Sequence, residues 1–304
     1  MLKNIQILSA DKIDQSKWDQ CINNASNGLI YSRYDYLDNM CDNWHGLVIN
    51  DYDAVMALPW RKKFGIRYLY QPAFIQQLGL IGEYENVVEE IIPLIHSFSK
   101  YGDILFNFAN VDIISRLNVS QRVNLVIDLS KDYEAIYSDF RKDLINNLRK
   151  SEKEKLHIST EENINLAISM YKDLYKQRMK NLTDDEYLRF ERLCFLLQQK
   201  NMCITRTVKD KAENTLAIGL FLKDEKRIYN LMNSTTDEGR TKEANHFLLA
   251  QVITEFSGSD MLFDFEGSDI LGVKSFYEKF GAVDQPYFYY HYNKLPKLLR
   301  LIKP

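Results

Sequence analysis

The sequence predicts an α/β protein of two fused domains, each a mixed, mostly antiparallel sheet flanked by helices. The chain has 304 residues, which suggests about two domains at roughly 150 residues each. Its two halves also repeat one order of elements: helices, then a run of strands, then a strand, a helix and a strand. We place the boundary near Ser130, so that residues 1–129 and 130–304 are the two predicted domains.

Hydrophobic periodicity predicts the elements of the first half, since apolar residues at helical spacing indicate helices and short apolar runs between turns indicate strands. The predicted helices are Asp11–Asn24, Arg33–Met40, Tyr84–Phe98 and Val111–Leu117. The predicted strands are Ile5–Leu8, Gly46–Asn50, Ala54–Trp60, Ile66–Tyr70, Phe74–Leu80, Asp103–Phe108 and Arg122–Leu129. Pro93 should kink the third of these helices or move its start.

The same patterns predict the elements of the second half. The helices are Asp132–Lys150, Glu161–Lys180, Asp184–Gln199, a helix ending near Phe256, and Ile270–Phe280. The strands are Met202–Val208, Thr215–Leu222, Arg227–Asn233, Met261–Glu266 and Gln285–Tyr292. A loop over Ser234–Thr241 should join the third strand to the fourth helix, and a basic tail follows Asn293.

The composition excludes several classes of protein. Apolar residues make up 45% and charged residues 27%, as in globular proteins and unlike disordered or collagen-like chains. The 39 basic and 42 acidic residues give a net charge of −3, so the chain has no overall attraction for nucleic acid or an anionic membrane. Contact with either would need a local basic patch.

The cysteines and the apolar runs bear on metal binding and location. Cys21, Cys41, Cys194 and Cys203 have no metal-ligand spacing, so we interpret them as free buried thiols in a reducing compartment. The chain begins without an apolar signal-like segment, and no apolar run reaches about 18 residues. We therefore expect a cytoplasmic protein without a metal site or a membrane span.

The segment Arg227–Phe280 carries the features that point to chemistry. A predicted strand leads through Asp237–Lys242 into a helix, whose first N–H groups and partial positive charge favour an anion. The next strand ends in Phe263–Ser268, and the next helix carries Ser275–Ala282. A strand, an anion-binding helix start and a polar strand end thus follow one another.

This order resembles the GCN5-related N-acetyltransferase superfamily, in which acyl-coenzyme A enters a gap where the sheet splays open. The resemblance implies that an acyl-coenzyme A, such as acetyl-coenzyme A, is bound by Asn233, Ser234, Gly239, Arg240, Thr241, Lys242, Ala244 and Asn245. Arg240 matches the pyrophosphate turn of that superfamily, but the two glycines of the turn fall on Glu243 and Asn245. A carboxylate there would repel phosphate, so a different donor remains open.

Nearly the whole chain also resembles the Fem-type peptidoglycan aminoacyltransferases, which are two fused acetyltransferase-like domains, and especially tandem proteins of Bacteroidetes-type bacteria. The segments that carry this resemblance are Leu58–Ile66, Tyr70–Phe74, Arg141–Lys150, Phe263–Ser268 and Phe276–Gly281. It implies the fold, a cell-wall or small-molecule amine as acceptor, and aminoacyl-tRNA as an alternative donor. The coiled-coil arm of some Fem enzymes has no counterpart in the sequence.

Two residues are the catalytic candidates. Tyr277 matches the superfamily's tyrosine that protonates the departing thiolate, although a core-facing tyrosine would give the same pattern. Glu266 and Asp264 alternate along one strand and should share a face, and Glu266 beside Gly267 could act as general base. The alternative role of Glu266 is to cap the following helix, which Ser268 or Asp269 could do instead.

Two further groups are candidates for substrate binding. Trp60 and Arg61 begin a basic cluster after a strand, and Tyr70 and Gln76 should line the same groove between the domains. Arg141 and Arg149 lie in the segment Arg141–Lys155, whose six basic and three acidic residues could hold an RNA or cell-wall phosphate. A solvated helix face with charge pairs would account for that segment equally.

The sequence favours an N-acyltransferase. No nucleophilic Ser or Cys with His and acid partners is recognisable, so direct transfer in a ternary complex is the simpler mechanism. The alternatives are a Fem-like aminoacyltransferase and a noncatalytic binding module on a degenerate transferase fold.

Overall fold

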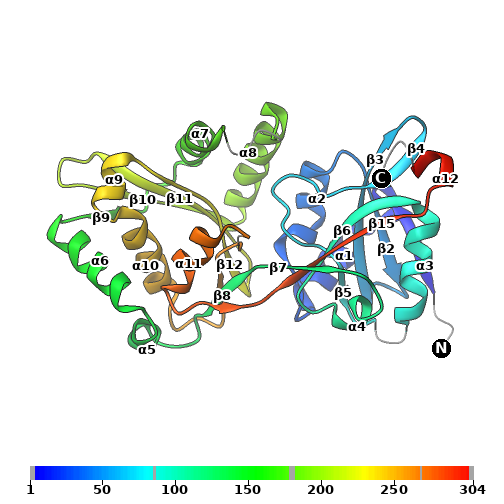
Figure 1. The fold of residues 1–304 in the computed structure, drawn as a ribbon, viewed down its shortest axis with the longest axis horizontal. Helices are drawn as coiled ribbons and strands as arrows, with labels where there is room; N and C mark the ends of the chain where they lie inside the picture. The colour runs from blue at the N-terminus through cyan, green and yellow to red at the C-terminus, as the bar shows by residue number, and fades with distance from the viewer. Residues whose placement is uncertain (1–3, 85–86, 178–181, 268, 301–304) are drawn as a thin grey trace. The chain divides into compact units, whose positions relative to one another are not determined.

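The computed structural model describes residues 4–84, 87–177, 182–267 and 269–300. The chain divides into two compact units (Figure 1): unit 1 is Met1–Arg122 with Pro286–Pro304, and unit 2 is Val123–Gln285. The division therefore lies before the predicted boundary near Ser130, and the last strand returns to unit 1. Mixed sheets flanked by helices confirm the predicted fold class.

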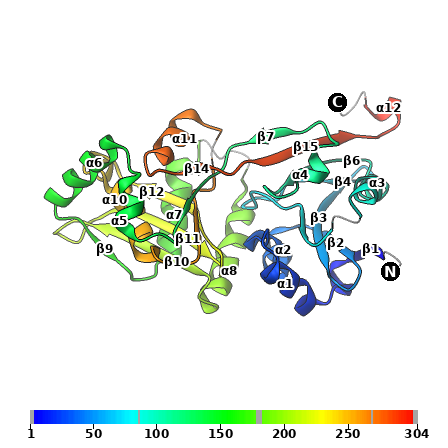
Figure 2. The ribbon, with the colours of Figure 1, turned by 90° about the horizontal axis from the view of Figure 1, so that it is seen from below.

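Unit 1 consists of one sheet with helices against it (Figure 2). Its helices are α1 (Gln15–Asn24), α2 (Tyr34–Met40), α3 (Val88–Phe98), α4 (Val111–Ile114) and α12 (Lys297–Arg300), with 3-10 turns η1 (Ala10–Lys12) and η2 (Ile30–Ser32). Its strands are β1 (Ile5–Ser9), β2 (Trp44–Ile49), β3 (Ala54–Lys63), β4 (Ile66–Leu69), β5 (Leu80–Gly82), β6 (Tyr101–Phe106), β7 (Ser120–Arg122) and β15 (Tyr287–Asn293). The order is β1-β2-β3-β4-β6-β15-β7, with β5 paired to β3.

Two expectations for this unit were wrong. The segment Phe74–Leu80 is not a strand, because Phe74 and Gly79 have φ angles of 57° and 83°, which turn the backbone out of an extended path. The segment Gln285–Tyr292 does form a strand, but β15 pairs antiparallel with β6 of unit 1, from Phe288 opposite Phe106 onward. Local apolar patterns do not say which distant strand will be the partner.

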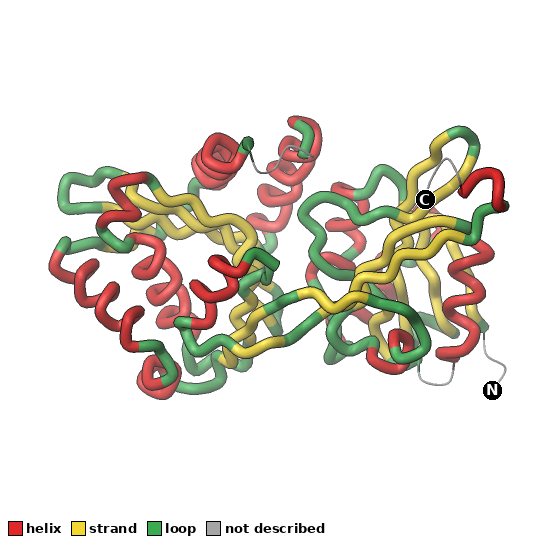
Figure 3. The backbone as a smooth tube through the Cα atoms, viewed as in Figure 1, coloured by secondary structure: helices red, strands yellow, loops and turns green. Residues whose placement is uncertain are grey.

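Unit 2 has a second sheet, ordered β14-β8-β13-β12-β11-β10-β9. Its strands are β8 (Leu125–Asp128), β9 (His157–Ser159), β10 (Cys203–Lys209), β11 (Thr215–Lys223), β12 (Arg227–Thr235), β13 (Leu262–Asp264) and β14 (Val283–Asp284). Its helices are α5 (Tyr133–Ser138), α6 (Lys142–Lys153), α7 (Ile164–Tyr175), α8 (Asp184–Gln199), α9 (Asp237–Thr241), α10 (Ala244–Phe256) and α11 (Leu271–Glu278). Helices α7 and α10 cover opposite faces of this sheet (Figures 1 and 3).

Three predicted boundaries in unit 2 need correction. The predicted helix Asp132–Lys150 is two helices, because Phe140 packs on Phe280 and the Arg141 N–H donates to the Lys279 carbonyl at 2.8 Å. The predicted loop Ser234–Thr241 contains the end of β12 and helix α9, which Thr236 caps by accepting from the Gly239 N–H. The helix predicted over Glu161–Lys180 is α7, and residues 178–180 lie outside the described residues.

Candidate active site

The sheet of unit 2 opens between β12 and β13. These parallel strands pair only from Arg227 opposite Leu262 to Tyr229 opposite Asp264, although β12 continues alongside β11 to Thr235. A β-bulge at Leu231 follows directly, because Leu220 pairs with Met232 while Phe221 pairs with Asn230. The edge of β12 beyond Tyr229 therefore has no strand partner on its β13 side within the described chain.

A buried ion pair holds the two strands together, between the first paired residue of β12 and the last paired residue of β13. The Arg227 guanidinium donates to Asp264, and both side chains are almost fully buried, at 5% and 1% exposed. Arg227 also donates to Gln285 Oε1 at 2.8 Å, and Asn124 Nδ2 donates to Asp264 at 3.2 Å. Asp264 is therefore a structural anchor between the two strands.

Glu266 lies just beyond the end of β13 in a constrained backbone. Its N–H donates to Asp264 Oδ1 at 2.9 Å, and its φ angle is 61°, in the left-handed region. Gly267 follows at φ 48°, where a Cβ atom would lie 2.0 Å from the Val123 carbonyl oxygen. The strand ends at Asp264, so strand alternation does not determine on which side the Glu266 side chain lies.

Burial makes Glu266 an unusually basic carboxylate. Loss of hydration raises the pKa of this side chain from an ordinary 4.5 to about 8, while part of the residue stays exposed. A general base works best when its pKa lies near the operating pH, so a carboxylate of this basicity suits proton removal from an amine. This property is compatible with the predicted role of Glu266 as a base.

Tyr277, on α11, lies close to Glu266. Burial raises the pKa of the Tyr277 hydroxyl, and Tyr171, Tyr175 and Glu266 raise it further by charge repulsion. The ring of Tyr277 stacks on Phe265 with centroids 4.5 Å apart. The hydroxyl therefore keeps its proton through neutral pH and can donate it, as the predicted acid must.

Two asparagines of β12 add polar groups beside Tyr277. The Asn230 amide opposes part of the rise in the pKa of Tyr277, and its oxygen accepts a hydrogen bond from the Asn233 amide. Nδ2 of Asn230 and Oδ1 of Asn233 are buried without a conventional hydrogen-bond partner. Asn233 Oδ1 therefore offers an acceptor to a bound group, while the Asn230 amide interacts with the Tyr277 hydroxyl.

The turn expected to hold pyrophosphate is filled by the protein itself. Glu243 caps helix α10 at φ 60°, so this position has the backbone conformation that favours glycine. The Glu243 carboxylate lies 3.2 Å from Lys150 Nζ and 3.0 Å from His246 Nδ1. Burial lowers the pKa of His246, and Glu243 opposes that shift.

Coenzyme A does not fit this turn. A carboxylate already lies at the start of α10, and the only nearby cation that pairs with it among the described residues, apart from His246, is Lys150. Asn245 adds a side chain, with a buried Oδ1, where the superfamily has its second small residue. A pyrophosphate would meet repulsion and crowding instead of open N–H groups.

Most of the other residues predicted to bind the cofactor have partners of their own, whereas Ser234 Oγ is buried without a hydrogen-bond partner among the described residues. Gly239 packs inside α9, where a Cβ atom would lie 2.2 Å from the Leu216 carbonyl oxygen. Arg240 pairs with Asp237 at 3.1 Å, and Lys242 with Glu238 at 2.7 Å. Ser234 and Ala244 are buried, and the Thr241 hydroxyl donates to the Glu238 carbonyl.

The predicted substrate residues of the first half belong to unit 1. Arg61 Nε lies 2.5 Å from Asp42 Oδ2, and its guanidinium stacks 4.0 Å from the Tyr70 ring. Trp60 donates to His45 Nδ1 at 3.0 Å, and Gln76 Oε1 accepts from Gln77 at 2.8 Å. These residues have clear local roles, and their place in an inter-domain groove stays a prediction.

The predicted basic helix is α6 of unit 2. Arg141 caps it and pairs with Glu278 of α11 at 3.1 Å, while Arg149 is exposed. Lys150 and Asn147 of this helix reach the start of α10, where they contact Glu243 and His246. The helix thus contributes one cation next to the candidate site.

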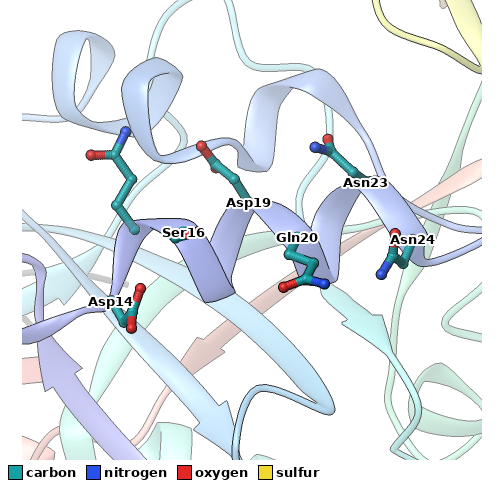
Figure 4. A pocket seen from close by; sticks show the side chains of 7 residues that line it. Asp14, Ser16, Asp19, Gln20, Asn23 and Asn24 are labelled. Carbon is teal, nitrogen blue, oxygen red and sulfur yellow. The ribbon is translucent and has the colours of Figure 1, made fainter.

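A separate hollow of about 700 Å³ lies along α1 in unit 1 (Figure 4). It is lined by Asp14, Gln15, Ser16, Asp19, Gln20, Asn23 and Asn24. All seven belong to one helix and its cap, and Asp19 pairs with Arg33 at 3.5 Å. The hollow includes none of the predicted site residues.

The described residues show neither a metal-binding cluster nor a membrane-spanning helix. They contain no group of three or more His, Cys, Asp or Glu side chains arranged to hold a metal ion. None of their helices is long and apolar enough to cross a membrane. Cys41, Cys194 and Cys203 are buried and Cys21 partly so, and none of the four forms a disulfide bond within the described residues.

Several site residues were missed by the sequence patterns. Tyr171 and Tyr175 lie in the helix predicted over Glu161–Lys180, to which no functional role was assigned, yet both influence Tyr277. Asn230 lies beside a β-bulge that apolar periodicity does not reveal, whereas Asn233, just beyond the bulge, was among the residues predicted to bind the donor. The contact of Lys150 with Glu243 joins residues 93 positions apart, so no local motif predicts it.

Removing the Asp264 carboxylate should strongly destabilise the protein. Asp264→Ala leaves Arg227 buried without its partner, which we expect to cost about 3–5 kcal/mol in urea unfolding. Asp237→Ala, which removes the exposed partner of Arg240, is the control and should cost less than about 1 kcal/mol. Equal losses would show that the buried pair is no anchor.

Glu266 should make stability depend on pH. The folded protein binds its proton more tightly than the unfolded chain, because the pKa is about 8 instead of 4.5. Stability from this group is complete at low pH and declines as pH rises toward about 8, by at most about 1.4 kcal/mol per unit. Glu266→Gln should lack this decline in urea titrations between about pH 5 and pH 8. A constant difference between variant and wild type would contradict the raised pKa.

Solved structures share the fold. No protein-family model and no curated protein matches the chain. FemX has a TM-score of 0.69 at 14% identity, and each chain is fully covered, at 100%. A conserved protein of unknown function from Bacteroides thetaiotaomicron VPI-5482 has a TM-score of 0.62 at 10% identity, over 92% of this chain and 98% of that one. L-PGS from Bacillus licheniformis has a TM-score of 0.55 at 12% identity, over 95% of each chain. This chain therefore shares its fold with FemX along its whole length.

Proposed function

We propose that the protein is an N-acyltransferase that joins an acyl group to an amine where β12 and β13 part. The observation that carries this proposal is that Glu266 and Tyr277 lie close together at that opening. The pKa of Glu266 is raised to about 8, and Tyr277 stays protonated. A base and an acid with well-separated pKa values are what such a transfer needs. The Fem-like fold supports the same class of reaction.

The residues divide the reaction between them. The Glu266 carboxylate takes a proton from the acceptor amine, and the amine nitrogen then attacks the carbonyl carbon of an ester or thioester donor. A backbone N–H on the unpaired edge of β12 would stabilise the oxyanion. When the tetrahedral intermediate collapses, the leaving oxygen or sulfur receives the Tyr277 proton.

The residues at the start of α10 favour the donor of the Fem-like alternative, aminoacyl-tRNA, over an acyl-coenzyme A. Glu243 fills the turn that would hold pyrophosphate, and its charge is satisfied by Lys150 and His246. An aminoacyl-tRNA delivers its acyl group on a ribose ester and has no pyrophosphate for this turn to bind. We therefore propose aminoacyl-tRNA as donor and an amine of a cell-wall precursor as acceptor.

Both catalytic candidates should be needed for turnover. Glu266→Gln and Tyr277→Phe should each lower the rate of acyl transfer by about 100-fold or more, because each removes one proton transfer. The assay follows transfer from a pool of radiolabelled aminoacyl-tRNAs to a cell-wall precursor amine. In wild type the rate should rise with pH toward about 8, as Glu266 loses its proton.

Matched controls separate chemistry from folding. Glu213→Gln and Tyr101→Phe make the same changes away from the opening, at an exposed and a partly exposed residue, and should retain wild-type rates. If ligands bind but neither candidate variant alters turnover, the fold serves as a binding module and the catalytic assignment is wrong.

Donor selection can be tested by binding alone. Calorimetry should detect no micromolar binding of acetyl-coenzyme A to wild type, because Glu243 repels its phosphates. Glu243→Gly combined with Asn245→Gly should create binding, since both changes restore the superfamily's turn. Micromolar binding by wild type would instead make coenzyme A the donor.

A further inference from the structure

The hairpin of β3 and β4 ends in an apolar side chain that is almost fully exposed. Phe64 is 89% exposed, more than any other large apolar side chain among the described residues. It forms the turn with Gly65, and the two have φ angles of 51° and 80°. No atom lies within 4 Å of a Cβ built on Gly65, and Figure 3 shows the hairpin extending outward from unit 1.

The same hairpin is strongly basic. Lys62 and Lys63 precede Phe64 and are exposed, and Arg67 lies directly opposite Lys62 in the strand register. Residues 54–69 contain no acidic residue. No ion pair joins Lys62 or Lys63 to an acid in the described part of the chain.

Neighbouring lysines extend the basic surface of the hairpin. Ser99 Oγ donates to the Arg67 carbonyl at 3.1 Å, so the exposed Lys100 lies next to the base of the hairpin. The Lys294 N–H donates to the Lys100 carbonyl at 2.7 Å, which brings another exposed lysine to the same edge. Arg61 adds no net charge, because it pairs with Asp42.

We propose that this basic tip, defined as Lys62, Lys63, Phe64 and Arg67 with Lys100 and Lys294, docks onto an anionic phospholipid bilayer. Phe64 enters the interfacial layer, and the cations lie against the lipid phosphates. The chain as a whole has a net charge of −3, so the attraction is local to this surface. The proposal does not depend on the transferase chemistry of unit 2.

The aromatic residues favour a bilayer over a nucleic acid. Proteins that bind single strands offer open aromatic faces on which bases stack. Here the Arg67 guanidinium covers the rings of Trp60 and Phe98, at 4.5 and 4.3 Å from their centroids. The Phe64 ring projects at the tip of the hairpin, with Lys63 Nζ 5.7 Å from its centroid, and can penetrate between headgroups.

The test is co-sedimentation of the full chain with vesicles. Wild type should bind vesicles of equal parts phosphatidylglycerol and phosphatidylcholine. This binding should weaken at least about fivefold when the salt concentration rises from about 0.1 to about 0.5 M. Lys62→Glu with Lys63→Glu should weaken binding at least about 20-fold, and Phe64→Ser at least about fivefold. Vesicles of phosphatidylcholine alone should bind little.

Controls and contrary outcomes are defined by the same assay. Leu188→Ser and Lys211→Glu change exposed residues of unit 2 and should bind like wild type. Wild-type binding by the tip variants, or equal binding to neutral vesicles, would overturn the proposal. So would absent vesicle binding together with tRNA binding that the lysine variants lose, which would identify the tip as a nucleic-acid surface.

Discussion

The buried ion pair between Arg227 and Asp264 is the interaction on which the candidate site depends. It joins the first paired residue of β12 to the last paired residue of β13, and beyond Asp264 the strands part. Asp264 uses its other oxygen to accept the Glu266 N–H, so the same carboxylate fixes the backbone that carries the candidate base. Gly267 then lets the chain pass against the Val123 carbonyl.

Glu243 and Glu266, two glutamates of unit 2, have different roles because the groups around their carboxylates differ. Glu243 has a lysine and a histidine beside its carboxylate, which stabilise its charge and let it occupy an anion site. For Glu266 the main influence is burial, which raises the pKa of its carboxyl group and makes it a stronger base. The first glutamate explains why coenzyme A is disfavoured, and the second explains where proton transfer can occur.

The sequence predicted much of this architecture, because apolar periodicity reports which face of an element is buried. It failed where a distant contact decides the outcome. Phe140 and Arg141 interrupt a helical pattern because they contact α11 and its end, and β15 finds its partner in unit 1. Tyr277 was predicted from family resemblance and Glu266 from its place at the end of a strand beside Gly267, whereas the Arg227–Asp264 anchor and the contact between the two asparagines depend on folded geometry that no local pattern contains.

The most direct test of the account is the titration of Glu266 itself. Carbon-13 NMR of the side-chain carboxyls, with the Glu266→Gln variant identifying the signal, measures its pKa in the intact protein. The account predicts a midpoint near 8. A midpoint near the ordinary 4.5 would mean that the opening between β12 and β13 is well hydrated, and Glu266 could not be the base proposed here.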